Sequence, residues 1–296
     1  MDIDQKVTKG FKMVVLDMDG TALNSDHELT SKTIDTLGRL SSLGVKIAFA
    51  TGRSSISVYS YMEILSLTQS HVPVICFNGS VCNTIDKLGQ SNELFSYPLL
   101  KESAAELVAF AESRGEVLQY YDGVSGIVYA APKTEEHLVL LDRYAKLTGR
   151  KQTFIESYDD LLVTLNPAKI LILTNKADDL VAASKTELPQ GKYHIIRGSP
   201  DPFFVEYLKP FVNKGASLVS LAEHLSIPLD QIIAFGDGDN DIEMLTCGCF
   251  GVAMANGRHN VRDVAQAVTT FTNNEDGVAW FLEELDRAHK LEYSSS

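Results

Sequence analysis

Several features that are common in other protein classes are missing from this 296-residue sequence. No run of apolar residues approaches the ~20 that a membrane-spanning helix requires. Residues 1–10 contain no apolar segment of the kind found in secretory signals. The four cysteines are too few for a disulfide framework in a chain of this length. We therefore expect a cytoplasmic protein with reduced thiols and no membrane partner.

Basic residues are also in short supply. Lys and Arg number 26 against 39 Asp and Glu, which gives a formal net charge of −13. This acidic excess argues against binding to nucleic acid or to an anionic membrane surface, although a metal ion can still create a local anion site. The apolar share of 45% and the charged share of 22% are those of an ordinary globular protein. The length suggests about two domains of ~150 residues each.

Several nucleotide-binding and metal-binding motifs are absent from the sequence as well. It has no GxxxxGK[ST] phosphate loop, no HExxH segment and no cluster of His and Cys for zinc. The segment "GDGDND" is not a dinucleotide fingerprint, because aspartate replaces the third glycine. An EF-hand is excluded too, since Ile242 stands where that loop needs glycine and Gly248 where it needs glutamate.

Apolar strand-like runs alternate with helical periodicity in the first and last thirds of the chain. The runs are "MVVL", "VKIAFA", "VPVICF", "QIIAFG" and "CFGVAM". Thr30 is the expected N-cap of the first helix, and a late helical stripe is expected to extend from Val261 to Val268. Continuous apolar strands between helices indicate a parallel sheet covered on both faces. We therefore predict a doubly wound α/β domain built from residues 1–85 and 209–296.

The middle of the chain, residues 86–208, shows a different pattern. The runs "VLQYY" and "GIVYA" flank "DGVSG", which predicts an antiparallel hairpin. Further strand-like runs are "KILILT", "YHIIR" and "FFVEYL". The segment Ser103–Glu106 has the spacing of a helix capping box. We therefore predict an α+β domain inserted into a loop of the α/β domain.

Polar or small residues follow the expected strands of the α/β domain. They are Asp17 and Asp19; Thr51, Gly52 and Arg53; Asn78 and Gly79; and Asp237, Asp239, Asn240 and Asp241. Ligands bind beyond the carboxyl ends of strands in an open parallel sheet, so up to five carboxylates would share one crevice. Carboxylates ~4 Å apart repel by roughly 4 kcal/mol per pair at an effective dielectric of about 20. A hard divalent cation removes this repulsion, and Mg²⁺ is the usual ion beside a phosphate.

The order of the motifs carries a family resemblance. The segments "VVLDMDGTALN", "FATGR", "FNG", "VNKG" and "IAFGDGDNDIEML" resemble the phosphatases of the haloacid dehalogenase (HAD) superfamily. The long insert after "FNG" and the late "TNNEDGVA" resemble the Cof-type subgroup, type IIB. This resemblance covers residues 12–85 and 209–290. It implies a Rossmann-like core, a C2-type cap, Mg²⁺ as cofactor, and hydrolysis of small phosphorylated metabolites that are often sugar phosphates.

The resemblance also assigns roles to the matching residues. Asp17 would be the nucleophile that forms an aspartyl-phosphate. Asp19 would be the general acid and base, and crowding by Asp17 is expected to raise its pKa. The Mg²⁺ ligands would be Asp17, Asp19 through its backbone carbonyl, Asp237 and Asp241. Contacts to phosphate and substrate would come from Thr51, Gly52, Arg53, Asn78, Lys214 and Asn240.

Two other functions stay open at this point. A phosphomutase would share the nucleophile but return the phosphoryl group to the sugar, and a non-catalytic metabolite-binding protein would keep the fold without the reaction.

Two residue roles stay open as well. Asp239 is either part of the site or a solvated carboxylate that caps a helix, and Arg53 either contacts substrate or pairs with a carboxylate. The substrate and the oligomeric state do not follow from the sequence.

Overall fold

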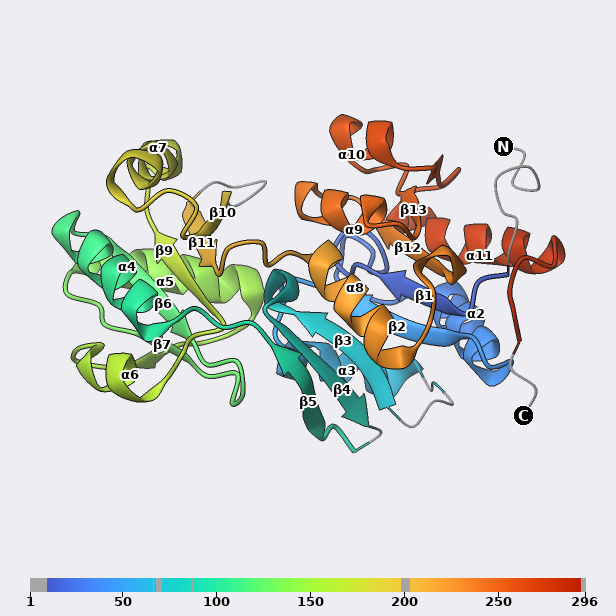
Figure 1. The fold of residues 1–296 in the computed structure, drawn as a ribbon, viewed down its shortest axis with the longest axis horizontal. Helices are drawn as coiled ribbons and strands as arrows, with labels where there is room; N and C mark the ends of the chain where they lie inside the picture. The colour runs from blue at the N-terminus through green and yellow to red at the C-terminus, as the bar shows by residue number, and fades with distance from the viewer. Residues whose placement is uncertain (1–9, 66, 68–70, 87, 198–202, 294–296) are drawn as a thin grey trace. The chain divides into compact units, whose positions relative to one another are not determined.

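The chain folds into two compact units in a computed structural model that describes residues 10–65, 67, 71–86, 88–197 and 203–293. The core unit comprises Met1–Phe95 and Asn213–Ser296, and the insert unit comprises Ser96–Val212. Figure 1 shows that the insert unit is one continuous stretch of chain. The first limit lies beyond the expected residue 85 because a further strand, β5 (Ser91–Ser96), still pairs in the core sheet. The C-terminal limit of the insert unit lies four residues beyond the expected residue 208. Residues 1–9 and 294–296 are outside the described part.

The core unit is built on an eight-stranded sheet in the order β14-β13-β12-β1-β2-β3-β4-β5. Its strands are β1 (Met13–Leu16), β2 (Lys46–Ala50), β3 (His71–Cys76), β4 (Val81–Asp86), β5, β12 (Ile232–Gly236), β13 (Phe250–Ala253) and β14 (Ala267–Val268). The strands from β14 to β3 are parallel, and β4 runs antiparallel to β3. Strands β2 and β3 lie on one side of β1, and strands β12 to β14 lie on the other side. The direction of winding therefore reverses at β1, where such sheets bind ligands.

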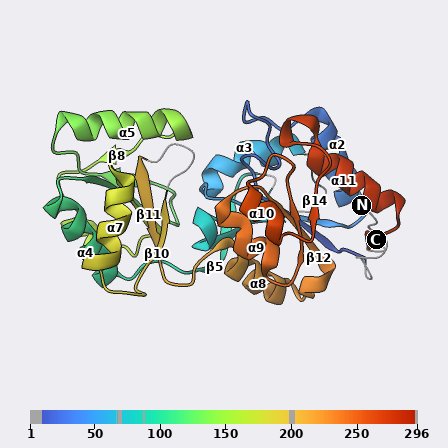
Figure 2. The same cartoon turned by 90° about the horizontal axis from the view of Figure 1, so that it is seen from above.

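Helices cover both faces of the core sheet, as Figure 2 shows. On one face lie α2 (Ser31–Ser42), α3 (Ser55–Leu65) and α11 (Gly277–Arg287); on the other lie α8 (Lys214–Leu225), α9 (Ile242–Thr246) and α10 (His259–Val264). Short 3₁₀ turns are η1 (Phe77–Gly79), η2 (Leu229–Gln231), η3 (Asp239–Asp241) and η4 (Asn273–Glu275). None of the helices in the described residues combines the length and the hydropathy needed to cross a membrane.

Two expected helix features in the core unit have different outcomes. The N-cap prediction for Thr30 is confirmed, because its side chain accepts a hydrogen bond from the Thr33 N–H. The predicted helical stripe that extends to Val268 is wrong. The backbone becomes extended at Ala265, and β14 then pairs with β13 through Val252 and Ala267. Pairing at the sheet edge therefore overrides the helical spacing of these apolar residues.

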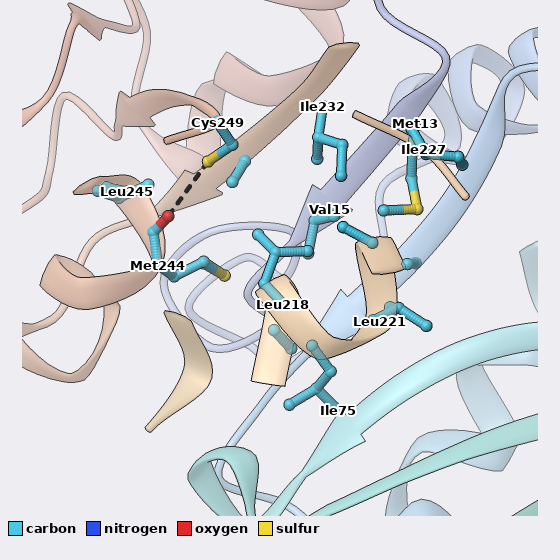
Figure 3. Close-up of a cluster of buried hydrophobic side chains, with 14 of the residues drawn as sticks. Met13, Val15, Ile75, Leu218, Leu221, Ile227, Ile232, Met244, Leu245 and Cys249 are labelled. Atoms are coloured by element: carbon cyan, nitrogen blue, oxygen red, sulfur yellow. Dashed lines mark hydrogen bonds between the residues drawn. The ribbon is translucent and has the colours of Figure 1, made fainter. Parts of the chain in front are cut away.

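The α8 face of the core sheet carries a tightly buried apolar cluster, drawn in Figure 3. Leu218 and Leu221 of α8 are fully buried against Val15 of β1 and Ile75 of β3. Burial of each leucine side chain stabilises the fold by about 2 kcal/mol. This packing fixes the first turn of α8, which begins at Lys214, against the carboxyl ends of the strands.

The insert unit has its own six-stranded sheet in the order β10-β11-β9-β6-β7-β8. Its strands are β6 (Val117–Tyr121), β7 (Val128–Ala130), β8 (Thr153–Phe154), β9 (Lys169–Leu173), β10 (His194–Arg197) and β11 (Phe204–Leu208). The pairs are antiparallel except for β7 with β8. The hairpin predicted around "DGVSG" is confirmed, because β6 and β7 pair antiparallel through Tyr121 and Val128. The doubly wound core with an inserted α+β unit is thus the fold predicted from the sequence.

The helices of the insert unit are α4 (Lys101–Ser113), α5 (Glu135–Thr148), α6 (Asp159–Thr164) and α7 (Ala177–Glu187). Apolar residues of α4 and α7 pack on one face of the sheet, whereas α5 contacts the other face through Tyr144 and Phe204. The capping box predicted at Ser103–Glu106 is wrong. Helix α4 begins at Lys101 with Leu100 as its N-cap, three residues before the expected one, so Ser103 lies inside the first turn.

Candidate active site

The carboxyl ends of the central core strands are level with one another. Leu16 at the end of β1 is in register with Phe49 of β2 and Phe235 of β12. The backbone N–H of Asp17 donates to the carbonyl of Phe235 at 3.0 Å, which continues the pairing past the strand end. Asp17, Thr51 and Asp237 therefore emerge side by side at the point where the winding reverses.

Three of the predicted aspartates form an acidic cluster there: Asp17, Asp237 and Asp241. One carboxylate oxygen of each lies within 4.8 Å of the others. The Nζ of Lys214 donates to Oδ1 of Asp17 at 2.6 Å and to Oδ1 of Asp241 at 2.7 Å. Lys214 is fully buried, and Asp17 and Asp241 are nearly so. The cluster therefore brings three carboxylates against a single ammonium group in a largely dry environment.

This imbalance shifts the protonation equilibria of the cluster. Burial raises the pKa of Asp17 well above its ordinary value; Lys214 opposes the shift, while Asp241 and Asp237 add to it. Burial and the neighbouring Asp241 raise the pKa of Asp237 to about 6. Burial alone would lower the pKa of Lys214, but the carboxylates of Asp17 and Asp241 hold it above its usual range. The cluster thus has a deficit of positive charge.

Backbone and side-chain donors hold the acidic cluster in place. Oδ2 of Asp241 accepts hydrogen bonds from the N–H groups of Asp237 and Gly238, both at 3.0 Å. The Thr21 hydroxyl donates to Oδ1 of Asp237 at 3.0 Å. Gly20 has φ +81°, and a Cβ there would stand 2.5 Å from Oδ2 of Asp237. Glycine is therefore required at this turn by both conformation and space.

The acidic cluster fits a magnesium ion. Its donors are all carboxylate oxygens, the ligands that Mg²⁺ prefers, and no nitrogen or sulfur donor joins them among the described residues. A dication would also supply the missing positive charge. Asp19 was expected to contribute only its backbone carbonyl to the metal site. Its carboxylate lies outside the cluster.

Asp19 instead forms an ion pair with Arg53. The Nε of Arg53 donates to Oδ2 of Asp19 at 2.7 Å, and its Nη2 donates to Oδ1. Nδ1 of His27 lies 3.0 Å from the same Oδ1. Burial alone would raise the pKa of Asp19, but Arg53 and His27 lower it below its ordinary value. The expectation that crowding by Asp17 raises this pKa is therefore wrong for this arrangement, because the Arg53 guanidinium and the hydrogen bond with His27 outweigh burial.

His27 and Tyr61 were not identified from the sequence, yet both help to place Arg53. The Tyr61 hydroxyl accepts a hydrogen bond from Nη1 of Arg53 at 3.1 Å and donates to the His27 carbonyl at 3.0 Å. The guanidinium also lies over the Tyr61 ring, 5.5 Å from its centroid. No motif marks these two residues, because only the folded chain brings α3 and the loop after β1 together.

The remaining predicted contact residues gather at the ends of β2 and β3. Asn78 adopts a left-handed conformation with φ 55° in η1, and Nδ2 of Asn240 donates to its Oδ1 at 3.0 Å. The Thr51 hydroxyl accepts the Arg53 N–H at 3.1 Å, and Gly52 lies against the Asn78 side chain. The structure therefore connects these residues with both Arg53 and η3, the turn that contains Asp241.

Asp239 is separated from this arrangement. Its half-exposed carboxylate forms an ion pair with Arg258 and accepts a hydrogen bond from Nδ2 of Asn260 at 2.9 Å. The N–H groups of Asp237 and Gly238, just before η3, are bound by Asp241, and the N-cap of η3 is Gly238 rather than Asp239. Of the two alternatives for Asp239, the geometry favours a surface carboxylate, held by side chains rather than as a helix cap.

Comparisons with known proteins cover nearly the whole chain. The sequence model of the haloacid dehalogenase-like hydrolases matches residues 14–282. The chain is 30% identical over 275 residues to the 5-amino-6-(5-phospho-D-ribitylamino)uracil phosphatase YitU of Bacillus subtilis, covering 92% of this chain and 96% of that protein.

Solved structures show the same likeness. A haloacid dehalogenase-like hydrolase from Bacteroides thetaiotaomicron has a TM-score of 0.79 at 26% identity, covering 93% of this chain and 99% of its own. A sugar phosphatase of HAD subclass IIB has a TM-score of 0.74 at 20% identity, covering 95% of this chain and all of its own. The second likeness concerns the fold alone.

Proposed function

Because the chain belongs to the haloacid dehalogenase-like hydrolases, we propose that it is a Mg²⁺-dependent phosphatase of small phosphomonoesters that works through an aspartyl-phosphate. The family and the phosphatase class that the sequence predicts are confirmed by the match over residues 14–282 and by the related phosphatases. Our proposal adds the metal ion, the roles of the residues and the class of substrate.

The observation that carries the proposal is the unbalanced acidic cluster around Lys214. The buried site holds three carboxylates against one lysine, so a single dication would balance its excess negative charge and let a phosphate approach without net repulsion. When bound to Asp17, Asp237 and Asp241, Mg²⁺ would supply the positive charge that offsets the carboxylates and the phosphate. Such charge neutralisation and positioning account for most of the catalysis in phosphoryl transfer.

Within this site Asp17 is the proposed nucleophile. Its carboxylate oxygen attacks phosphorus, the bond to the leaving oxygen breaks, and an aspartyl-phosphate forms. Lys214 holds one oxygen of Asp17 at 2.6 Å, which orients the carboxylate and neutralises charge on the phosphate. Water then attacks phosphorus, releases inorganic phosphate and restores the Asp17 carboxylate.

Asp19 is the proposed proton carrier for both halves of the reaction. It would give a proton to the leaving alkoxide and later accept one from the attacking water. The first task needs a protonated carboxyl, which the ion pair with Arg53 disfavours. We therefore expect Arg53 to leave Asp19 when substrate binds and to contact the substrate phosphate together with Thr51, Gly52, Asn78 and Asn240.

The relatives support one class of substrate as the first to test. The Bacillus subtilis relative is named for a compound with a phospho-D-ribitylamino group, so phosphorylated sugars and sugar alcohols are the first class to test. We assign the choice among them to the insert unit, as a cap. A phosphomutase and a non-catalytic binding protein are the alternatives, and no observation in the structure favours either one.

The test is phosphate release from p-nitrophenyl phosphate, followed by a screen of sugar, nucleotide and cofactor phosphates. Asp17→Asn is expected to abolish release while the fold is kept, and Asp35→Asn on the exposed face of α2 is the matched control. EDTA should silence the wild-type protein, and added Mg²⁺ should restore it. Wild-type rates in Asp17→Asn would overturn the mechanism, indifference to EDTA would remove the metal, and transfer without free phosphate would indicate a phosphomutase.

A further inference from the structure

The four cysteines form two pairs in very different surroundings. Cys76 and Cys82 lie on the neighbouring strands β3 and β4, and both are fully buried. Cys247 and Cys249 flank Gly248 in the segment between α9 and β13, where Cys247 is partly exposed and Cys249 is buried. The proposed phosphatase chemistry uses neither pair.

The thiols of Cys247 and Cys249 are directed to one point. Each Sγ lies 3.2 Å from the carbonyl oxygen of Met244, in the last turn of α9. Figure 3 shows this contact for Cys249 at the edge of the apolar cluster. A fully extended chain would hold the two Cα atoms roughly 7 Å apart, at the limit for a disulfide. Gly248, with φ +109°, bends the chain between them and shortens that separation.

The electrostatics of this pair are asymmetric. A hydrogen bond from the Cys249 thiol lowers the pKa of Cys247 to about 7; burial opposes this, and the backbone N–H groups of both cysteines support it. The same hydrogen bond, together with burial, raises the pKa of Cys249 well above its ordinary value. A pKa of about 7 makes the partly exposed Cys247 a thiolate in a sizeable fraction of molecules at neutral pH, whereas Cys249 remains a thiol.

The other pair has neither an exposed sulfur nor a lowered pKa. Burial raises the pKa of both thiols, that of Cys82 to about 12, so neither is a thiolate at neutral pH. Cys76 donates to the carbonyl of Val74 in its own strand. Cys76 and Cys82 thus provide an internal control within the same protein.

We propose that Cys247 and Cys249 are a modification site, a dithiol that a hydroperoxide oxidises to an intramolecular disulfide. The thiolate of Cys247 attacks the outer oxygen of the hydroperoxide, the O–O bond breaks, and the alkoxide leaves with a proton from solvent. Cys247 is then a sulfenic acid. The Cys249 sulfur attacks it, the S–O bond breaks, and water leaves with the thiol proton of Cys249. One hydroperoxide is reduced by two electrons, and two thiols are oxidised.

The test treats the folded full chain with a slight excess of hydrogen peroxide at neutral pH, followed by alkylation and peptide mass mapping. The wild-type product is expected to lose two hydrogen masses in the peptide that contains Cys247 and Cys249, and dithiothreitol should restore them. Before oxidation, iodoacetamide should label Cys247 at least ~100-fold faster than Cys76 or Cys82, in line with their thiolate fractions.

Two variants separate the roles of the sulfurs. Cys249→Ser should stop at a sulfenic acid on Cys247 that dimedone traps, whereas Cys247→Ser should leave Cys249 reduced. Cys247 is partly exposed, so its replacement tests the proposal even where Cys249→Ser fails to fold. Oxidation of Cys76 or Cys82 first, a stable dimedone adduct in the wild type, or a disulfide between two chains would each overturn the proposal. These readouts do not depend on phosphatase activity.

Discussion

Each unit of the molecule buries a lysine, and the two lysines have very different partners. Lys214 of the core unit is fully buried against Asp17 and Asp241, with Asp237 close by. Lys169 of the insert unit has a side chain that is 3% exposed, and its Nζ lies 2.9 Å from Oε2 of Glu206. Its ammonium group also lies 4.9 Å from the centroid of the Tyr121 ring. The burial is similar, but the charge balance is not.

The difference separates a structural ion pair from a site. Burial lowers the pKa of Lys169, but Glu206 more than offsets this, so one positive and one negative charge face each other. In the core unit one lysine faces three carboxylates, and two of those carboxylates have raised pKa values. A fold does not gain stability from an excess of buried like charge. The imbalance therefore marks the core-unit cluster as a group able to hold a metal ion, whereas the balanced pair at Lys169 needs none.

The largest expected effect comes from Lys214→Met. This change keeps the length of the side chain but removes the charge that holds Asp17 and that we propose to neutralise the phosphate. We expect phosphate release from p-nitrophenyl phosphate to fall by roughly 10³-fold or more. Lys169→Met is the control, and its rate per folded molecule should stay close to that of the wild type. Equal losses of rate in both variants would contradict the distinction between the two lysines.

For Lys169→Met the expected loss is in stability. Glu206 would lose the ammonium group that balances its charge while it stays buried, which costs about 3–5 kcal/mol in the free energy of unfolding. The double variant Lys169→Met with Glu206→Leu should recover most of that loss, because a pair of apolar side chains leaves no charge unpaired. Urea unfolding of the wild type, both single variants and the double variant measures the coupling. If the double variant is as unstable as Lys169→Met, the lost stability does not come from the charge of Glu206.

Much of the core fold follows from the sequence because its strands are continuous apolar runs. The same reasoning places Asp17, Thr51, Asn78 and Asp237 at strand ends, since parallel strands finish at one edge. It fails where two kinds of structure compete for the same residues. Val261 and Val268 have helical spacing, yet Val268 pairs with Ala253 of β13 as part of a strand.

The site is predictable where its residues come from strand ends and not where they come from tertiary contacts. His27 and Tyr61 reach Arg53 only after the chain has folded. The predicted direction of the shift in the pKa of Asp19 was wrong for the same reason. Sequence proximity pointed to Asp17, whereas the dominant partner is Arg53, 34 residues further along the chain.

A smaller effect, of opposite sign, is expected from Asp237→Asn in the metal-free protein. The pKa of Asp237 is about 6 in the fold against an ordinary 3.8. Folding therefore favours the protonated form, and this group's contribution to stability is present below pH ~4 and lost as the pH rises through about 6. Ionisation costs roughly 3 kcal/mol at most, and asparagine avoids that cost.

We therefore expect Asp237→Asn in EDTA to be more stable than the wild type by about 1–3 kcal/mol at pH 7.5, with the gain shrinking toward pH 4. Urea unfolding at several pH values measures it. The same variant should lose phosphatase activity, since a proposed metal ligand is gone. A gain that does not change with pH would mean that the charge of Asp237 is not its source.

The smallest effect is expected from Asp239→Asn, two residues from a member of the acidic cluster. The Asp239 carboxylate is about half exposed, and its partners are Arg258 and Asn260. Exposed ion pairs contribute about 0–1 kcal/mol to the free energy of unfolding. Because Asp239 lies apart from the acidic cluster, the rate of phosphate release should also stay within about twofold of wild type. Asp241→Asn is the matched comparison, because its carboxylate binds Lys214 and the N–H groups of Asp237 and Gly238. If Asp239→Asn instead matched the loss in Asp241→Asn, proximity along the chain rather than burial beside Lys214 would define the site.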